Sequence, residues 1–248
     1  MIDKNLVHAR FAKNLKNYND NAKIQKRMAE RLVSFVSNKC PKSILEIGCG
    51  TGFLTEQIVK HCEFSSYKAI DIVEECEEYI KQISTNITFT PIDFEEYLKN
   101  SDEKFDLIIS NASLQWAEDF EGAINSLKNL LNPDGELVFS TFGNENFREI
   151  YHVIGASLNY YSIAELNKMF QNCLIEPEIH IMAFDTPKDV LKHLQLTGVN
   201  GVENQTWTKK DLIRFENGYK NICNRRPTLT YNPIFIKIKN NIIQSPKC

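Results

Sequence analysis

The sequence lacks the features that define several large protein classes. None of its 248 residues fall in an apolar run of the roughly 18 residues that would cross a bilayer. The amino terminus also lacks the short apolar block of a secretory signal. We therefore expect a soluble protein that does not associate with membranes.

Cysteines and histidines are not grouped as metal sites require. The seven cysteines are an odd number without a CxxC pair, and the five histidines form no cluster at metal-ligand spacing. We predict no metal site and a reducing, cytoplasmic compartment. Cys49 lies inside a glycine-rich turn, but no His or Asn pattern supports it as a catalytic nucleophile.

Charge is small overall but unevenly distributed. The net charge is -3, yet residues 1–31 hold eight Lys or Arg and only three Asp or Glu. Such a basic arm could steer an acidic partner or nucleic acid. It could also be a solvated helix face, or a mitochondrial targeting arm, because residues 4–19 contain no acid. Charge alone favours the solvated face.

The most informative stretch is SILEIGCGTGFLTEQI, residues Ser43–Ile58. Its apolar start predicts a buried strand, and its end predicts a helix over Phe53–His61. Between them, three glycines permit a turn in which a ligand can approach the backbone closely; these are Gly48, Gly50 and Gly52. A dinucleotide-binding fold would favour another glycine where this chain has Phe53.

Strands and helices alternate as far as Phe142. This alternation predicts parallel crossovers and therefore an α/β fold with a doubly wound, mostly parallel, seven-stranded sheet. An earlier helix is expected over 22–36. The further predicted strands are 67–71, 87–92, 105–110 and 136–141, and the further predicted helices are 74–83 and 119–131, with a turn at 132–135.

Beyond Phe142 the alternation becomes irregular. We predict helices over 146–159, 162–173, 187–196 and 208–222, and strands over 178–184 and 234–238. We expect one domain, residues 1–248, with an amino-terminal helical arm (1–40), a ligand-binding core (41–142) and a carboxyl-terminal half (143–248) of capping helices and last strands.

Polar residues follow several of the predicted strands. In an open α/β sheet, ligands bind beyond the carboxyl ends of the strands, where Glu46, Asp71, Asp93 and Asn111 fall. Each aspartate could instead only cap the helix that follows it. Their occurrence together with the glycines favours ligand binding.

The pattern ExGxGxG, the acid closing the second strand and the Asp93–Phe94 pair after the third together resemble class I S-adenosylmethionine-dependent methyltransferases. The resemblance implies that S-adenosylmethionine is the cofactor and that no metal is used. Asp71 would accept the ribose hydroxyls and Asp93 the adenine amine, while Glu46 and the carbonyl near Asn111 would hold the methionyl end. The other implied cofactor-binding residues are Gly48, Cys49, Gly50, Gly52, Ile72 and Phe94.

A narrower resemblance extends over nearly the whole chain. Phe105–Phe120, FDLIISNASLQWAEDF, resembles the SNxxxQW signature of malonyl-acyl carrier protein methyltransferases of biotin synthesis. Three more segments resemble that family, namely FAKNLKNYND (11–20), VLKHLQLTGVNG (190–201) and RRPTLTYNPIFI (225–236). One departure is Gln195, which stands where relatives usually have lysine.

The resemblance implies methyl esterification of the free carboxylate of a malonyl thioester, on acyl carrier protein or coenzyme A. A carboxylate with a pKa of about 4 is already ionised at neutral pH, so no general base and no catalytic residue are predicted. The buried substrate carboxylate should meet an arginine, with Arg226 the first choice and Arg148 and Arg225 the alternatives. Tyr18 would close over the site, and the pocket walls would include Gln115 and Trp116.

The partner implied by this resemblance is the acidic acyl carrier protein, docking on the basic amino-terminal region, and no nucleic acid is expected. Two alternatives stay open. One is a methyltransferase of another small carboxylate or of a quinone precursor. The other is a non-catalytic methyltransferase-like assembly factor of a respiratory complex. The GVN and LTY segments, residues 198–200 and 229–231, favour the enzyme.

Overall fold

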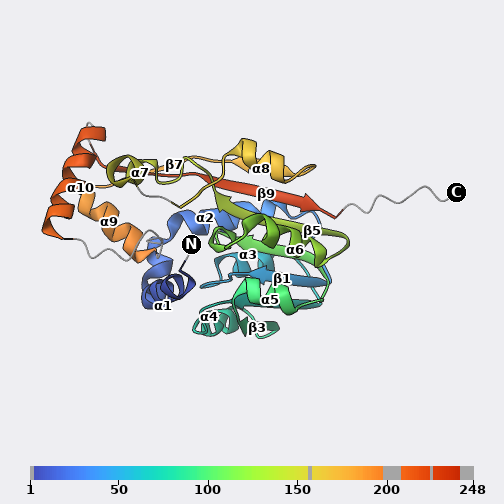
Figure 1. Cartoon of the computed structure of the whole chain (residues 1–248). Helices are drawn as coiled ribbons and strands as arrows, with labels where there is room; N and C mark the ends of the chain where they lie inside the picture. The colour runs from blue at the N-terminus through green and yellow to red at the C-terminus, as the bar shows by residue number, and fades with distance from the viewer. Residues whose placement is uncertain (1–2, 156–157, 198–207, 224–225, 241–248) are drawn as a thin grey trace.

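A seven-stranded sheet forms the centre of the computed structural model, which describes residues 3–155, 158–197, 208–223 and 226–240 (Figure 1). Its strand order is β3-β2-β1-β4-β5-β9-β6. The first five strands are parallel, and β9 is antiparallel to both β5 and β6. The predicted mostly parallel, doubly wound sheet is confirmed. The strands are β1 Ser43–Ile47, β2 Ser66–Asp71, β3 Ile87–Pro91, β4 Phe105–Asn111, β5 Leu131–Phe142, β6 Leu174–Pro177 and β9 Pro233–Lys239.

Helices cover both faces of the sheet, as the alternation of elements requires. One apolar cluster joins the sheet to α2 Lys23–Leu32, α3 Phe53–His61 and α4 Cys76–Ile83. A second cluster, on the opposite face, joins it to α5 Phe94–Asn100, α6 Phe120–Asn129 and α8 Ile163–Met169.

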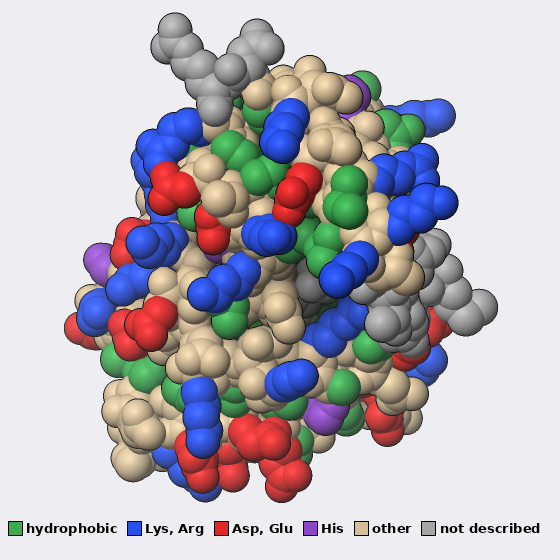
Figure 2. All heavy atoms as spheres, turned by 90° about the vertical axis from the view of Figure 1, so that its left-hand side faces the viewer, with side chains coloured by type: hydrophobic (Ala, Val, Ile, Leu, Met, Phe, Trp, Pro, Cys, Tyr) green, Lys and Arg blue, Asp and Glu red, His purple; other side chains and the backbone are tan. Residues whose placement is uncertain are grey.

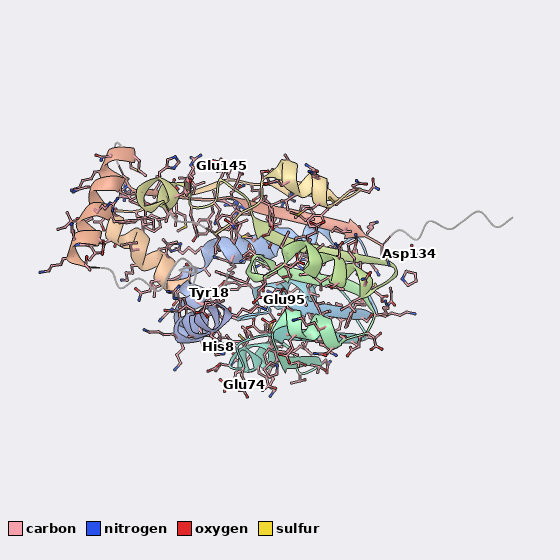
Figure 3. All side chains as sticks on the ribbon, in the orientation of Figure 1. His8, Tyr18, Glu74, Glu95, Asp134 and Glu145 are labelled. Atoms are coloured by element: carbon pink, nitrogen blue, oxygen red, sulfur yellow. The ribbon has the colours of Figure 1, made fainter. Side chains whose placement is uncertain are left out.

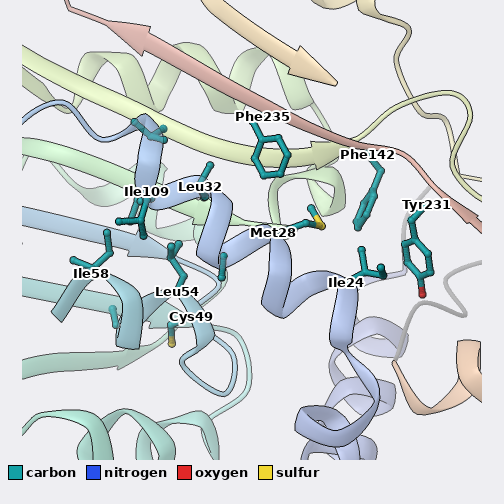
Figure 4. Packing of buried hydrophobic residues seen from close by; sticks show 14 of the residues in the cluster. Ile24, Met28, Leu32, Cys49, Leu54, Ile58, Ile109, Phe142, Tyr231 and Phe235 are labelled. Carbon is teal, nitrogen blue, oxygen red and sulfur yellow. The ribbon is translucent and has the colours of Figure 1, made fainter. Parts of the chain in front are cut away.

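Successive residues of the central strands belong to different clusters. On β4, Leu107 and Ile109 pack with α2 and α3, whereas Ile108 packs with α6. Figure 4 shows Ile109 beside Leu32 and Leu54 of the first cluster. Each such side chain, fully buried, stabilises the fold by about 1.5–3 kcal/mol. A strand covered on both faces therefore reads as a continuous apolar run.

Two helices precede the sheet. The helix expected over 22–36 is α2, continued by a short 3₁₀ turn, η1 Val33–Phe35. Before it, α1 Lys4–Asn21 forms most of the predicted amino-terminal arm, and Leu15 is its one fully buried residue among those described. The helix packs against α2 and against α9 Pro187–Leu196, so a segment from the second half of the chain supports it.

The elements after Phe142 differ most from the prediction. The helix expected over 162–173 ends early, at Met169, as α8, and residues 174–177, for which no strand was predicted, form the edge strand β6. Four residues are too few for a periodic signal, and β6 exists because it can pair with β9. The helix expected over 146–159 is confined to α7 Arg148–Ile154.

A second, two-stranded sheet was not predicted as such. The strand expected over 178–184 is β7 His180–Ala183, which pairs with β8 Thr228–Tyr231, a strand that the prediction missed. The last helix, α10 Lys209–Ile222, agrees with the prediction, since Thr208 is its amino-terminal cap. The turn expected at 132–135 lies within the residues assigned to β5, which begins at Leu131.

Candidate active site

The glycine turn after β1 adopts backbone conformations that side chains disfavour. Gly48 and Gly52 have φ angles of +66° and +86°. A Cβ at Gly48 would overlap the side chain of Ser113, and one at Gly52 would overlap that of Ile83. These two positions therefore need glycine, and the turn that they form brings main chain to the surface of a cavity.

Two adjoining cavities lie at the carboxyl ends of the central strands, where the sequence predicts a site. The first encloses about 850 Å³, including its open mouth, and the second about 440 Å³. The residues that line both are Val7, Gly48, Asp71, Ile72, Ser113 and Trp116. Because they share these residues, the two cavities adjoin at the glycine turn and Asp71.

Asp71 lies at the junction of the two cavities and is only 7% exposed. Its carboxylate accepts hydrogen bonds from the main-chain N–H of Gly50 (2.8 Å) and of Val73 (2.9 Å). Burial raises its pKa, against the opposing effect of these N–H groups. Capping of the next segment explains the Val73 bond but not the bond to the glycine turn, so Asp71 also joins two walls of the site.

The second cavity ends at Asp93 and Phe94. Asp93 caps α5 by accepting hydrogen bonds from the N–H groups of Glu95 (2.9 Å) and Glu96 (3.2 Å), so the capping alternative holds for this residue. The ammonium of Lys4 lies 2.8 Å from Asp93 and 2.5 Å from Glu95, and 5.7 Å above the Phe94 ring. Through Lys4, α1 is tied across the mouth of the second cavity.

Glu46, at the end of β1, lines the first cavity and is 1% exposed. One of its oxygens accepts hydrogen bonds from the hydroxyls of Tyr67 (2.6 Å) and Thr55 (2.7 Å). Burial raises its pKa to about 7, although these two hydrogen bonds oppose the shift. Near neutral pH this carboxyl group is therefore only partly ionised.

Asn111 and Gln115 come from the end of β4 and the 3₁₀ turn η2 Leu114–Trp116. The Asn111 amide donates to the main-chain carbonyl of Gln25 (2.9 Å), and its oxygen accepts from the Ser140 hydroxyl (2.7 Å). Gln115 donates to the carbonyl of Ala112 (2.6 Å). The signature segment after β4 is thus fastened to both α2 and β5.

Tyr18 of α1 lines the first cavity and reaches over the glycine turn. Its ring stacks on Phe53 at 5.9 Å and meets Phe11 edge-on at 4.9 Å. Burial raises the pKa of its hydroxyl, so this group is a neutral hydrogen-bond donor at physiological pH. Burial likewise raises the pKa of the Cys49 thiol far above its usual value, which keeps the sulfur protonated and argues against a nucleophile.

Two of the three predicted arginines, Arg226 and Arg148, lie outside the two cavities. Arg226 is 63% exposed and forms an ion pair with Asp185, and Arg148 is 45% exposed and forms one with Glu145. Figure 3 places Glu145 well away from Tyr18. Within the part of the chain that the structure describes, neither arginine lines the two cavities.

Three further elements of the prediction bear on substrate binding. Gln195 is exposed on α9. Arg225 and the GVN segment, residues 198–200, lie outside the described residues. An arginine partner for the substrate carboxylate therefore stays a prediction.

Several lining residues were not singled out by the sequence analysis. They include Gln25, Ser113, Phe142 and Thr197. For Gln25 a signal existed, because this polar residue falls on the buried side of α2 with Met28 and Leu32. The others lie in loops or at element ends, where no periodic pattern marks them.

No group of three or more His, Cys, Asp or Glu side chains that could hold a metal ion occurs among the described residues. In the same set of residues, every helix is too short or too polar to cross a membrane.

Comparison with known proteins first identifies the class of protein to which the chain belongs. A family model described as "Methyltransferase domain" matches residues 20–199, more than half of the chain. Solved structures agree in fold. The chain superposes on the YcgJ protein of Bacillus subtilis with a TM-score of 0.58 at 14% identity, covering 87% of this chain and 99% of that one. For the N-methyltransferase NodS of Bradyrhizobium japonicum, in complex with S-adenosyl-L-homocysteine, the TM-score is 0.56 at 17% identity, over 94% and 98% of the two chains.

Curated relatives narrow this class. Three that are named malonyl-[acyl-carrier protein] O-methyltransferase come from Calditerrivibrio nitroreducens, Chlorobium luteolum and Haemophilus influenzae. The Calditerrivibrio protein is 38% identical over 90% of this chain and 92% of its own. The Chlorobium protein is 33% identical over 95% of both chains. The Haemophilus protein is 30% identical over 98% of this chain and 97% of its own. The chain belongs to the malonyl-[acyl-carrier protein] O-methyltransferase family.

Proposed function

We propose that this protein transfers the methyl group of S-adenosylmethionine to the free carboxylate of malonyl-acyl carrier protein, giving a methyl ester. The observation that carries the proposal is the two-part cavity around Asp71, on a chain whose relatives bear that enzyme name over nearly their full length. This family membership favours the enzyme over a non-catalytic assembly factor.

The polar groups of the cavities suit this cofactor. A carboxylate at the junction, Asp71, can accept both hydroxyls of a ribose diol. The second cavity offers the Phe94 ring and the Asp93 carboxylate, which suit an adenine and its amine. The first cavity then receives the methionyl end, next to Gly48 and Asn111.

S-Adenosylmethionine, when bound, supplies an electrophilic methyl group on a sulfonium. The chain's own residues have to orient the acceptor and exclude water, because the carboxylate that attacks is already ionised. Holding the two reactants in line can be equivalent to an effective concentration of about 10⁵ M or more. We assign water exclusion to α1, whose Phe11 and Tyr18 cover the turn, and we assign to the Tyr18 hydroxyl a hydrogen bond to the acceptor carboxylate.

We also propose that the acyl carrier protein docks on the face formed by α1, α9 and α10. Figure 1 shows these helices at the same end of the molecule, and Figure 2 shows Lys and Arg side chains distributed across that face. Opposite charge would steer an acidic carrier to the open side of the first cavity. The exposed cations of this basic face are Lys13, Lys16, Lys188, Lys192, Lys209, Lys210, Arg214 and Lys220.

The proposed function is tested by incubating the full-length protein with S-adenosylmethionine and malonyl-acyl carrier protein. Intact-mass spectrometry should find one added methyl group on the malonyl moiety. Acetyl-acyl carrier protein, which has no free carboxylate, is the matched control and should gain none. Malonyl-coenzyme A in a parallel reaction decides whether the carrier protein is needed. Binding of the cofactor without methyl transfer to either thioester would contradict the proposal.

A further inference from the structure

Two glutamines that line the first cavity have a side-chain oxygen without a hydrogen-bond partner among the described residues. Gln25, on α2, is only 4% exposed, and its side-chain oxygen Oε1 is buried without a hydrogen bond among the described residues. The Oε1 of Gln115 is in the same situation. Both residues line the first cavity, together with Gly48 and Asn111.

Such groups are costly unless something binds them. Leaving a buried acceptor unsatisfied costs about 1–3 kcal/mol, and the large majority of buried polar atoms in folded proteins have a partner. The main chain at Gln25 cannot easily move, since its carbonyl accepts a hydrogen bond from the Asn111 amide and α2 is packed on the sheet. The main chain that carries this amide is therefore held in place, and a ligand that donates a hydrogen bond would satisfy its buried oxygen.

The position of Gln25 indicates which ligand group this is. An adenine and a ribose would occupy the second cavity, whose lining includes Asp71 but not Gln25. A carboxylate has only acceptor oxygens and cannot donate a hydrogen bond to the amide oxygens. An ammonium group offers three N–H donors and a positive charge, so it matches the unpaired acceptors of two residues that line one cavity.

We propose that the side-chain oxygen of Gln25, aided by that of Gln115, accepts hydrogen bonds from the α-ammonium of the methionyl part of the cofactor. This assignment rests on the proposed function. Glu46, the carboxylate at the end of β1, already accepts two hydroxyl hydrogen bonds through one of its oxygens. The glutamines thus give the ammonium neutral acceptors and set the position of the sulfonium relative to the incoming carboxylate.

The test compares two probes that differ in the methionyl part. S-Adenosylhomocysteine carries the ammonium, and 5′-methylthioadenosine has the same nucleoside and thioether without it. Calorimetry on the full chain should find that Gln25→Met lowers the affinity for S-adenosylhomocysteine by about tenfold or more, whereas the affinity for methylthioadenosine should not change. Gln25→Glu keeps an acceptor oxygen and should stay within a few-fold of the unaltered protein. Gln82→Met, at an exposed site on α4, is the matched control and should change neither affinity.

Each other outcome overturns the assignment. Equal losses for both probes in Gln25→Met would mean that the pocket has deformed and that the ammonium is not the partner. If Gln25→Met binds both probes as before but has a raised KM for the malonyl thioester, Gln25 contacts the methyl-accepting substrate and not the cofactor. A loss in Gln25→Glu as large as in Gln25→Met would show that the acceptor oxygen does not matter. If the unaltered protein binds neither probe, the proposed function fails along with this inference.

Discussion

Buried carboxylates lie at both ends of the central strands, and the two ends stabilise them differently. At the amino ends, Glu136 of β5 is 3% exposed and pairs with the Lys237 ammonium of β9 at 2.7 Å. At the carboxyl ends, the carboxylates of Glu46 and Asp71 accept hydrogen bonds from hydroxyl and main-chain N–H groups, and among the described residues neither forms an ion pair with Lys or Arg.

The Glu136–Lys237 pair at the amino ends belongs to a larger hydrogen-bond network. The second Glu136 oxygen accepts from the N–H groups of Ser37 (2.7 Å) and Asn38 (3.1 Å), and Lys237 donates to the carbonyl of Phe35 (2.6 Å). Asp106, on the neighbouring strand, accepts from the N–H of Lys42 and from the Asn132 amide. These groups hold the chain between α2 and β1 against the sheet, so this end serves stability.

The difference indicates a division of roles along the same strands. At the amino ends, the buried Glu136 carboxylate is already paired with the Lys237 ammonium, so no ligand is needed to satisfy it. At the other end Lys4 pairs with Asp93. Among the described residues, however, the buried carboxylates of Glu46 and Asp71 have no ion pair and two amide oxygens have no donor, which lowers stability and leaves groups available for binding. Four changes test this comparison.

The largest effect is expected from Asp71→Ala. Two hydrogen bonds to a charged acceptor are lost, each worth about 1.5–3 kcal/mol, so the affinity for S-adenosylhomocysteine should fall about 10²- to 10⁴-fold in calorimetry. Asp106→Ala removes a carboxylate at the opposite end and is the control, with unchanged affinity. Similar affinities in the two variants would remove the functional contrast between the ends.

Glu136→Ala should lower stability and leave binding intact. It leaves the Lys237 ammonium buried without its anion, which costs about 3–5 kcal/mol in the free energy of unfolding. Urea denaturation measures the loss. Replacing both partners, Glu136→Leu with Lys237→Met, should recover much of it, because no unpaired charge remains. A double variant as unstable as the single one would show that the pair itself is not the cause.

Glu46 should make stability depend on pH at the carboxyl end. Its pKa in the folded protein is about 7, above the ordinary value of 4.5, so the folded state holds the proton more tightly. The stabilising contribution is complete below about pH 4.5 and is lost as pH rises to about 7, by up to roughly 3 kcal/mol. As pH rises from about 4.5 to about 7, the free energy of unfolding of the unaltered protein should fall relative to that of the Glu46→Gln variant. Parallel stability curves for the two proteins would exclude the raised pKa.

The smallest effect concerns the basic face that borders the carboxyl end. Reversing Lys16 and Lys192 to Glu should raise the KM for malonyl-acyl carrier protein several-fold at low salt, since exposed charges contribute about 1 kcal/mol or less each and are screened. Malonyl-pantetheine, which has no carrier protein, should show no change. Lys128→Glu on α6 is the control. An equal rise for both substrates would argue against docking on this face.

Much of the fold could be predicted because its signals are local. The apolar run of Ile44–Ile47, the three glycines and the helix after them depend on neighbouring residues, and the structure confirms the mostly parallel, doubly wound sheet that was predicted. The structure also brings the predicted cofactor residues Asp71 and Asn111 to one cavity, since carboxyl ends of parallel strands share an edge.

The carboxyl-terminal half was harder because its short strands depend on distant partners. β6 exists by pairing with β9, and β8 by pairing with β7, and neither carries a periodic pattern of its own. The same reason applies to Arg226, which stands in a conspicuous segment but pairs with Asp185 at the surface.

The sequence by itself determined the strand–turn–helix unit at Gly48–Gly52 and the doubly wound arrangement, because periodicity and glycine spacing act over a few residues, and its signature segments indicated the family by resemblance. Only the tertiary structure decided which polar groups share the site. Lys4 reaches Asp93, and Gln25 shares a cavity with Gln115, because helices α1 and α2 pack across strands far away in the chain. Which groups meet in a cavity depends on such long-range packing, and no local pattern encodes it.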